Sequence, residues 1–322
     1  MPPYTQLRAS ITSDPRHYQI AVLGLLLVYG ISALDFEIAA SRAVAILTTA
    51  LVGQYACTRL WHLPRFDARS ALISGLSLCL LLRTSSNALA LTAAIIAVAS
   101  KFVIQINRKH VFNPTNIAIV GLMALTGQVW VSPGQWGNIA FFAFLMACLG
   151  GLVVNRAKRS DVTYAFIASY MALVVGRSIW LGEPLTIPLH RLQNGALLLF
   201  TFFMISDPRT TPNSRAGRIT FACLVACGAW YIQFRLFRTN GPLWSLAICS
   251  MAVPLIDRLL PADRYEWAAT GRSGRQFTSP KTNPLTEVVY ETIRTVTCSA
   301  DDRGRLEQPR AARILRLLRG QG

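Results

Sequence analysis

The sequence predicts an all-α protein that crosses a membrane many times. Hydrophobic residues make up 52% of the 322-residue chain and charged residues only 15%, which is outside the usage of ordinary globular proteins. Ten apolar segments divided by short polar turns account for this composition; they cover residues 18–34, 38–57, 70–82, 88–106, 115–131, 138–154, 162–181, 189–205, 217–234 and 242–260. Most of them approach the ~20 residues that a helix needs to cross a ~30 Å hydrocarbon core. We therefore expect about ten transmembrane helices.

The basic residues predict the orientation of these helices, because Lys and Arg favour cytoplasmic turns. They gather in every second turn and are sparser in the turns between; the gathered residues are Arg59, Arg65, Arg69, Lys101, Arg108, Lys109, Arg156, Lys158, Arg159, Arg209, Arg215 and Arg218. Both termini are therefore expected in the cytoplasm. If ten helices form two five-helix halves, the odd number in each half requires the halves to be inverted repeats.

The chain is expected to have three parts. Residues 1–17 form a cytoplasmic segment, 18–261 the membrane domain, and 262–322 a polar, basic, partly disordered tail. Within the tail, 284–297 and 311–319 could form amphipathic helices, or the whole tail could remain solvated. The net charge of +17 is concentrated in cytoplasmic turns, where it favours an anionic inner leaflet and not nucleic acid as partner. No cleavable signal peptide is expected, because the first apolar run is followed by acidic residues.

The first candidate binding segment precedes the fifth apolar run. Asn113 is placed as an N-cap, and Pro114 follows at the first helical position. With Phe112 and Asn116, this helix start would form a donor-rich concavity at the cytoplasmic boundary. Such a concavity would suit an anion or the edge of a flavin or quinone, whereas ordinary helix capping is the simpler interpretation.

The second candidate segment is the polar stretch 206–218, which is longer than a plain helix connection requires. Two of its prolines end one helix and delay the next. Its candidate ligand-binding residues are Asp207, Pro208, Arg209, Thr210, Thr211 and Arg215. Alternatively, the carboxylate at position 207 could order the loop by pairing with its arginines.

A third break follows the short third segment at Arg83, whose side chain could reach the outer interface or line a cavity. In a five-plus-five arrangement, 80–85 and 205–211 are both third-to-fourth turns, and inverted repeats place their sites at such matched breaks. No phosphate loop, dinucleotide fingerprint or hydrolase triad is present. Cys223 and Cys227 share a helix face but lack further metal ligands. We therefore expect neither a metal site nor a self-contained catalytic motif.

Three stretches of the sequence resemble the RnfD/NqrB family. Residues 99–114 are similar to its Lys-to-Phe-Asn-Pro signature, 203–218 to its Asp-Pro-x-Thr/Ser-x-Pro segment, and 74–78 to its Gly-Leu run in helix three. The resemblance implies an inverted-repeat inner-membrane subunit that carries flavin in ion-translocating electron-transfer complexes. It also implies that other redox or membrane subunits are partners.

The sequence departs from this family between its fifth and sixth helices. The Ser-Gly-Ala-Thr type motif that carries covalent FMN in the family is missing from residues 126–137, so the chain resembles the stand-alone branch that includes enediyne-biosynthesis companions. A non-covalent flavin, FMN or riboflavin, is expected instead. Asn113 and Asn116 would bond its ring edge, Phe112 would pack on it, and Arg209 or Arg215 would favour its reduced anion. A redox-silent channel or transporter, or a membrane scaffold, are the alternatives.

Overall fold

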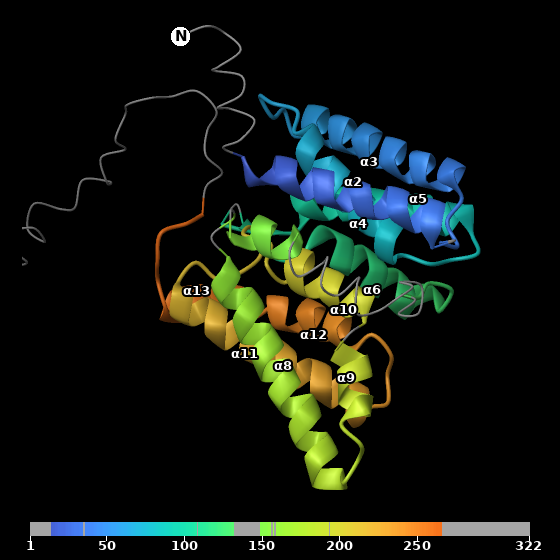
Figure 1. Ribbon diagram of the computed structural model, residues 1–322. Coiled ribbons are helices and arrows are strands. Elements are labelled where there is room, and N and C mark those ends of the chain that lie inside the picture. The colour runs from blue at the N-terminus through green and yellow to red at the C-terminus, as the bar shows by residue number, and fades with distance from the viewer. Residues whose placement is uncertain are drawn as a thin grey trace, which may run out of the picture. The chain divides into compact units, whose positions relative to one another are not determined.

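The computed structural model describes residues 14–34, 36–107, 109–131, 149–155, 157, 159–192 and 194–265, and these residues are mostly helical (Figure 1). The helices and strands are α2 (Pro15–Ala33), α3 (Ala40–Leu60), α4 (Ala68–Leu81), α5 (Asn87–Val103), β1 (Gln105–Ile106), β2 (Lys109–His110), α6 (Pro114–Thr126), α8 (Ser160–Leu181), α9 (Thr186–Leu192), α10 (Gly195–Leu199), η1 (Phe200–Met204), α11 (Arg215–Phe234), α12 (Gly241–Ser250) and α13 (Val253–Leu259). Strands β1 and β2 pair antiparallel as a small hairpin.

Nine of the ten predicted apolar segments correspond to these helices. The segment 138–154 lies mostly outside the described residues, although 149–155 is helical. The eighth segment is divided into α9, α10 and the π-helix η1, and the tenth into α12 and α13. The two candidate tail helices lie outside the described residues.

Two described helices, α3 and α8, are each long and apolar enough to cross a membrane alone. Helices α12 and α13 would add a third span if counted together, since they are bent by 53° at their break. Several other helices, including α4, α5 and α6, are apolar but shorter. This arrangement is that of a polytopic membrane protein, while the count of ten and the side on which the termini lie stay predictions.

The helices begin where side chains satisfy the free amides of the first turn. Asp14, Asp67, Ser86 and Ser214 accept hydrogen bonds from backbone amides at the starts of α2, α4, α5 and α11. The predicted cap at Asn113 is confirmed: its Oδ1 accepts the amide of the residue three positions later, 3.1 Å away.

The two halves of the described chain repeat one order of packing. In the first half, α3 packs on α5 and α5 on α6; in the second, α8 packs on α11 and α11 on α12. Figure 1 shows α2 to α5 side by side, and α8 crossing α11. The fifth helices, α6 and α12, contact each other between the halves. This repetition agrees with two five-helix units, and their inversion across a membrane remains a prediction.

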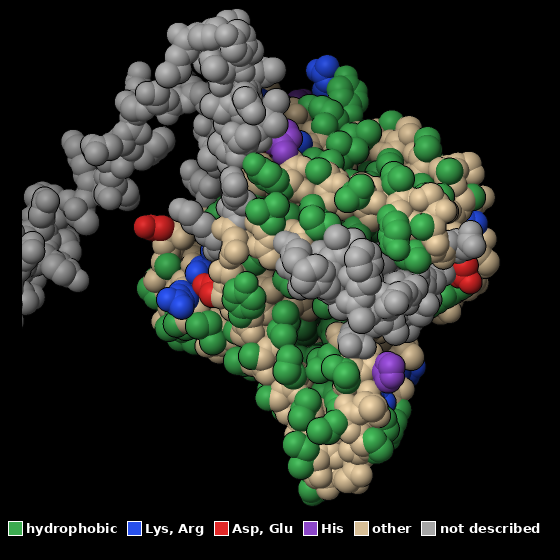
Figure 2. All heavy atoms as spheres, viewed as in Figure 1, with side chains coloured by type: hydrophobic (Ala, Val, Ile, Leu, Met, Phe, Trp, Pro, Cys, Tyr) green, Lys and Arg blue, Asp and Glu red, His purple; other side chains and the backbone are tan. Residues whose placement is uncertain are grey.

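Large apolar side chains cover the outside of these helices. Leu125 is 83% exposed and Trp180 79% exposed, values that are unfavourable in water and ordinary against lipid. Figure 2 shows a face dominated by hydrophobic side chains, with the visible charged groups at its margins. The buried core is rich in alanine, which lets neighbouring helices approach closely.

Arg83 differs from its favoured interpretation as an interface residue. Its side chain is buried, and its guanidinium donates to the carbonyls of Cys79, Leu80 and Leu82 at 2.8–3.2 Å. Its backbone also pairs with Trp130. The helix α4 ends inside the protein, so its unpaired carbonyls need a buried donor, and Arg83 supplies it.

Candidate ligand-binding site

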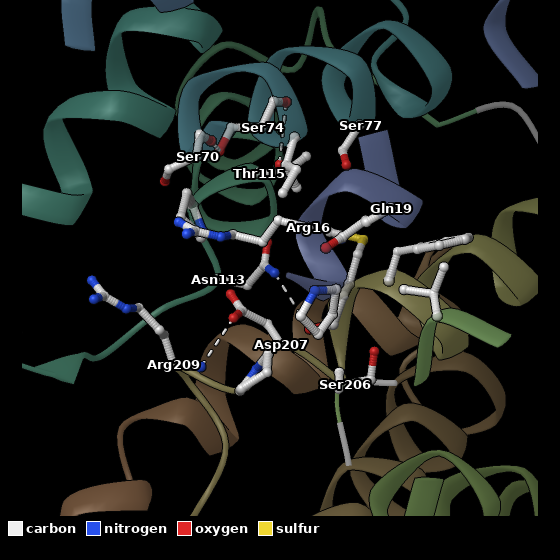
Figure 3. Close-up of a pocket in the computed structure, with 18 of the residues that line it drawn as sticks. Arg16, Gln19, Ser70, Ser74, Ser77, Asn113, Thr115, Ser206, Asp207 and Arg209 are labelled. Carbon is white, nitrogen blue, oxygen red and sulfur yellow. Dashed lines mark hydrogen bonds between the residues drawn. The ribbon is translucent and has the colours of Figure 1, made fainter. Parts of the chain in front are cut away.

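The two predicted cytoplasmic motifs meet at one cavity, which we call the first cavity. It holds about 870 Å³ of empty space, including its open mouth, and both Asn113–Thr115 and 206–209 line it. The remaining walls come from the starts of α2 and α4, from Lys101 of α5 and from His110 of the hairpin. Figure 3 shows these polar side chains converging from separate elements. Segments far apart in sequence therefore form a single concave site.

Asn113 connects the two motifs directly. While its Oδ1 caps α6, its Nδ2 donates to the carbonyl of Met204 at the end of η1, 3.3 Å away. The same carbonyl accepts the backbone amide of Asp207. The side chain is buried, so its amide acts as a clamp that holds the turn after η1 against the first turn of α6.

The carboxyl group of Asp207 lines the first cavity beside several cations. Its Oδ1 accepts the backbone amide of Arg209 at 3.0 Å (Figure 3). Burial raises the pKa of this carboxyl, and the Arg209 amide and nearby positive charges only partly oppose the rise. The loop is not ordered by pairing with Arg218, which instead binds Asp161 of α8.

His110 stands at the boundary of this cavity in a neutral form. Its Nε2 lies 3.3 Å from a guanidinium nitrogen of Arg209, which can only donate, so Nε2 is the acceptor. Its Nδ1 is buried without a hydrogen-bond partner among the described residues. Burial, together with the charges of Arg209 and Lys101, lowers the pKa of His110 to about 3. The imidazole therefore stays uncharged at physiological pH.

The opposite wall is fixed by buried charges at the starts of α2 and α4. Arg16 donates to Asp14 at 2.7 Å and to Asp67 at 2.8 Å, so one guanidinium joins two helix caps. Lys101, which is 4% exposed, donates from Nζ to the carbonyl and hydroxyl oxygens of Ser70 at 2.8 and 3.0 Å. These contacts hold two cations at the cavity with their geometry already set.

The predicted site residues divide into two groups. Asn113, Pro114, Asp207, Pro208 and Arg209 line the first cavity. The others do not line it; they are Phe112, Asn116, Thr210, Thr211 and Arg215.

Several of the outlying residues have structural contacts instead. Asn116 donates to the Leu243 carbonyl of α12 at 3.0 Å, and its buried Oδ1 has no partner among the described residues. The hydroxyls of Thr210 and Thr211 donate to the Asp207 carbonyl, which closes the turn. These residues position the site and do not face the cavity.

Sequence reasoning missed the contribution of α2 and α4 to the cavity. Arg16, Gln19 and Ser77 line it, although they lie in segments chosen only for their hydrophobicity. An arginine two residues after the helix cap Asp14 was the one available signal. The π-helix η1 was also missed, because its sequence is apolar throughout. Such π-turns occur often beside functional sites.

No group of three or more potential metal ligands occurs among the residues that the structure describes. Cys223 instead contacts Ser169, and Cys249 contacts Ser245. The arrangement is that of a helical membrane protein with a polar, cation-bearing cavity among its helix starts.

Comparison with known proteins agrees with this class. Residues 122–266 match the sequence profile of the NQR2, RnfD, RnfE family. The resemblance to the RnfD/NqrB family is therefore confirmed over this part of the chain, which includes the Asp207 motif. The Asn113 motif lies before the matched region.

The similar curated proteins are each named as the RnfD subunit of an ion-translocating oxidoreductase complex. The chain is 30% identical over 138 residues to that of Cronobacter sakazakii, 31% over 138 residues to that of Klebsiella pneumoniae, and 28% over 135 residues to that of Escherichia coli. These alignments cover 42%, 41% and 41% of this chain. They span 36% of each relative, about a third of its length.

Proposed function

We propose that this protein is a membrane electron-transport protein that binds a flavin non-covalently in the first cavity. The observation that carries the proposal is the convergence of the Asn113 and Asp207 motifs on one cavity. The relatives' name, with its oxidoreductase complex, supports a redox role, partner subunits and coupled ion transport. When bound, a flavin supplies the one- and two-electron chemistry that side chains lack.

The residues present fit such a group. The cavity volume of about 870 Å³ lies in the range of small-molecule sites, ~300–1,000 Å³. Phe202, Phe203 and Val154 give it apolar walls for a flat ring system. Gln19 and Asp207 offer donors and an acceptor for the polar ring edge.

Two groups at the cavity would determine the charge state of the ligand. Arg209 is exposed at the mouth and places positive charge near the ring, which favours a reduced, anionic ligand. Asp207 would accept from a ring N–H, and its raised pKa lets it hold a proton near neutral pH. Asn113 would act indirectly, because both its amide atoms are used by the protein.

The structure provides a matched pair of arginines for the test. Arg209 and Arg215 belong to the same loop and are both exposed, yet only Arg209 lines the cavity. Detergent-purified protein reconstituted with FMN or riboflavin should show the visible flavin absorbance. Arg209→Gln should weaken flavin binding about tenfold or more, the loss expected for a hydrogen bond to a charged group of ~1.5–3 kcal/mol, and Arg215→Gln should leave it unchanged.

Two further results would separate this proposal from its alternatives. The flavin should be lost on denaturation, so a fluorescent band that survives a denaturing gel would show covalent attachment. A wild type that stays colourless with both flavins, or equal affinities in the two arginine variants, would refute the flavin site. A channel, transporter or scaffold function would then take its place.

A further inference from the structure

A second cavity lies at the corresponding place in the other half of the chain. The first cavity is lined by the start of the fifth helix of its half, Asn113–Thr115, and by the end of the third helix of the other half, 202–204. The second is lined by the start of the other fifth helix, at Asn240 and Pro242, and by Leu81 at the end of α4. The internal repeat therefore produces two cavities from matched elements.

The third helices contribute to their own cavities in the same way. Asp67 caps α4 at the first cavity, and Asn194 caps α10 at the second, each by accepting backbone amides. The second cavity holds about 1030 Å³ of empty space, including its mouth. It shares no lining residue with the first cavity and is a separate site.

The polar side of the second cavity offers hydrogen-bond donors. The Oδ1 of Asn194 is used by the amides of Ala196 and Leu197, and the Oε1 of Gln233 accepts the hydroxyl of Tyr170 at 2.7 Å. The amide nitrogens of Asn194 and Gln233 are therefore the groups left to face a ligand. Such donors favour a ligand rich in acceptor oxygens.

Arg191 adds a positive charge to these donors. Its guanidinium lies 5.0 Å from the ring centre of Phe234, which holds it beside the cavity. Arg177 lies over the same ring and is paired with Glu183 at 2.9 Å, so that acid already has a partner. Among the described residues lining the second cavity, none is acidic. The site therefore carries net positive charge.

The rest of the second cavity is apolar and firmly supported. Leu81, Trp130, Leu197 and Phe200 form its walls. Arg83 holds two of them together, since its backbone pairs with Trp130 and its guanidinium caps the end of α4 beside Leu81. A ligand that fills the cavity must combine an anionic, acceptor-rich head with an apolar body.

We infer that the second cavity binds an amphipathic anion, whose head group is held by Arg191, Asn194 and Gln233 and whose apolar part lies against Leu81, Leu197 and Phe200. An anionic phospholipid and a free fatty acid both have this chemistry. The inference does not depend on flavin in the first cavity.

Native mass spectrometry of the full chain in detergent tests the inference. Dioleoyl phosphatidylglycerol, oleate and the zwitterionic dioleoyl phosphatidylcholine are titrated separately. The wild type should retain phosphatidylglycerol or oleate in preference to phosphatidylcholine. Arg191→Gln should weaken binding of the anionic probe about tenfold, and Arg191→Lys should restore most of it because the charge is kept.

Arg235→Gln is the matched control, because it removes an exposed arginine of the neighbouring helix end that does not line the cavity. It should bind like the wild type. A preference for phosphatidylglycerol identifies a lipid head group, and a preference for oleate identifies a carboxylate. Equal retention of all three probes, or equal loss in the glutamine variants at positions 191 and 235, would overturn the inference even if both variants fold.

Discussion

Replacing Asn113 tests how the two motifs of the first cavity are joined. Asn113→Leu removes the cap of α6, which is worth about 1 kcal/mol, and the bond to the Met204 carbonyl, worth about 1 kcal/mol net. The carbonyl keeps its second donor, the Asp207 amide, so no buried acceptor is left empty. The expected loss in unfolding free energy is therefore about 2 kcal/mol.

The two contributions can be separated by Asn113→Ser, because serine caps a helix but cannot reach the Met204 carbonyl in the same way. This variant should lose about 1 kcal/mol. Ser86→Ala, which removes only the cap of α5, provides the control at about 1 kcal/mol. Unfolding free energies would be measured by reversible titration with SDS in mixed micelles. If Asn113→Ser matches the wild type and Asn113→Leu matches Ser86→Ala, the clamp between the motifs does not exist.

Three further predictions concern protonation, helix packing and topology. Because the folded protein holds the pKa of His110 near 3, the unfolded chain alone takes up this proton as pH falls below about 6.5. Stability should be full above that pH and fall toward pH 3, by up to about 1.4 kcal/mol per pH unit for one proton, and His110→Asn should flatten this slope in pH-dependent unfolding. Gly241→Ala would place a methyl 2.6 Å from a backbone oxygen of α11 and should destabilise by about 1–3 kcal/mol, whereas Gly121→Ala meets nothing within 4 Å and should not, as paired thermal melts would show. Membrane-impermeant thiol labelling should reach Cys298 only from the cytoplasm and a cysteine introduced at Pro133 only from outside; the reverse pattern would invert the orientation.

The sequence by itself determined where the apolar helices lie. Hydrophobic runs and turns are local properties, so the segment predicted as 162–181 appears as α8, Ser160–Leu181, and 217–234 appears as α11, Arg215–Phe234. The cap at Asn113 was also predictable, because its hydrogen bond spans only three residues. The family resemblance followed from two short motifs, one of which lies within the profile match.

Only the tertiary structure decided which residues share a cavity. Asn113 and Asp207 are brought together by an amide bond to the Met204 carbonyl, a contact across 91 positions that no local pattern encodes. The burial of Arg83 depends on where α4 ends inside the bundle, and hydrophobicity cannot distinguish that end from one at a lipid interface. Arg16 and Gln19 looked like ordinary helix residues until α2 and α4 were packed side by side. Local sequence sets each helix, whereas packing between distant helices determines which faces become binding surfaces.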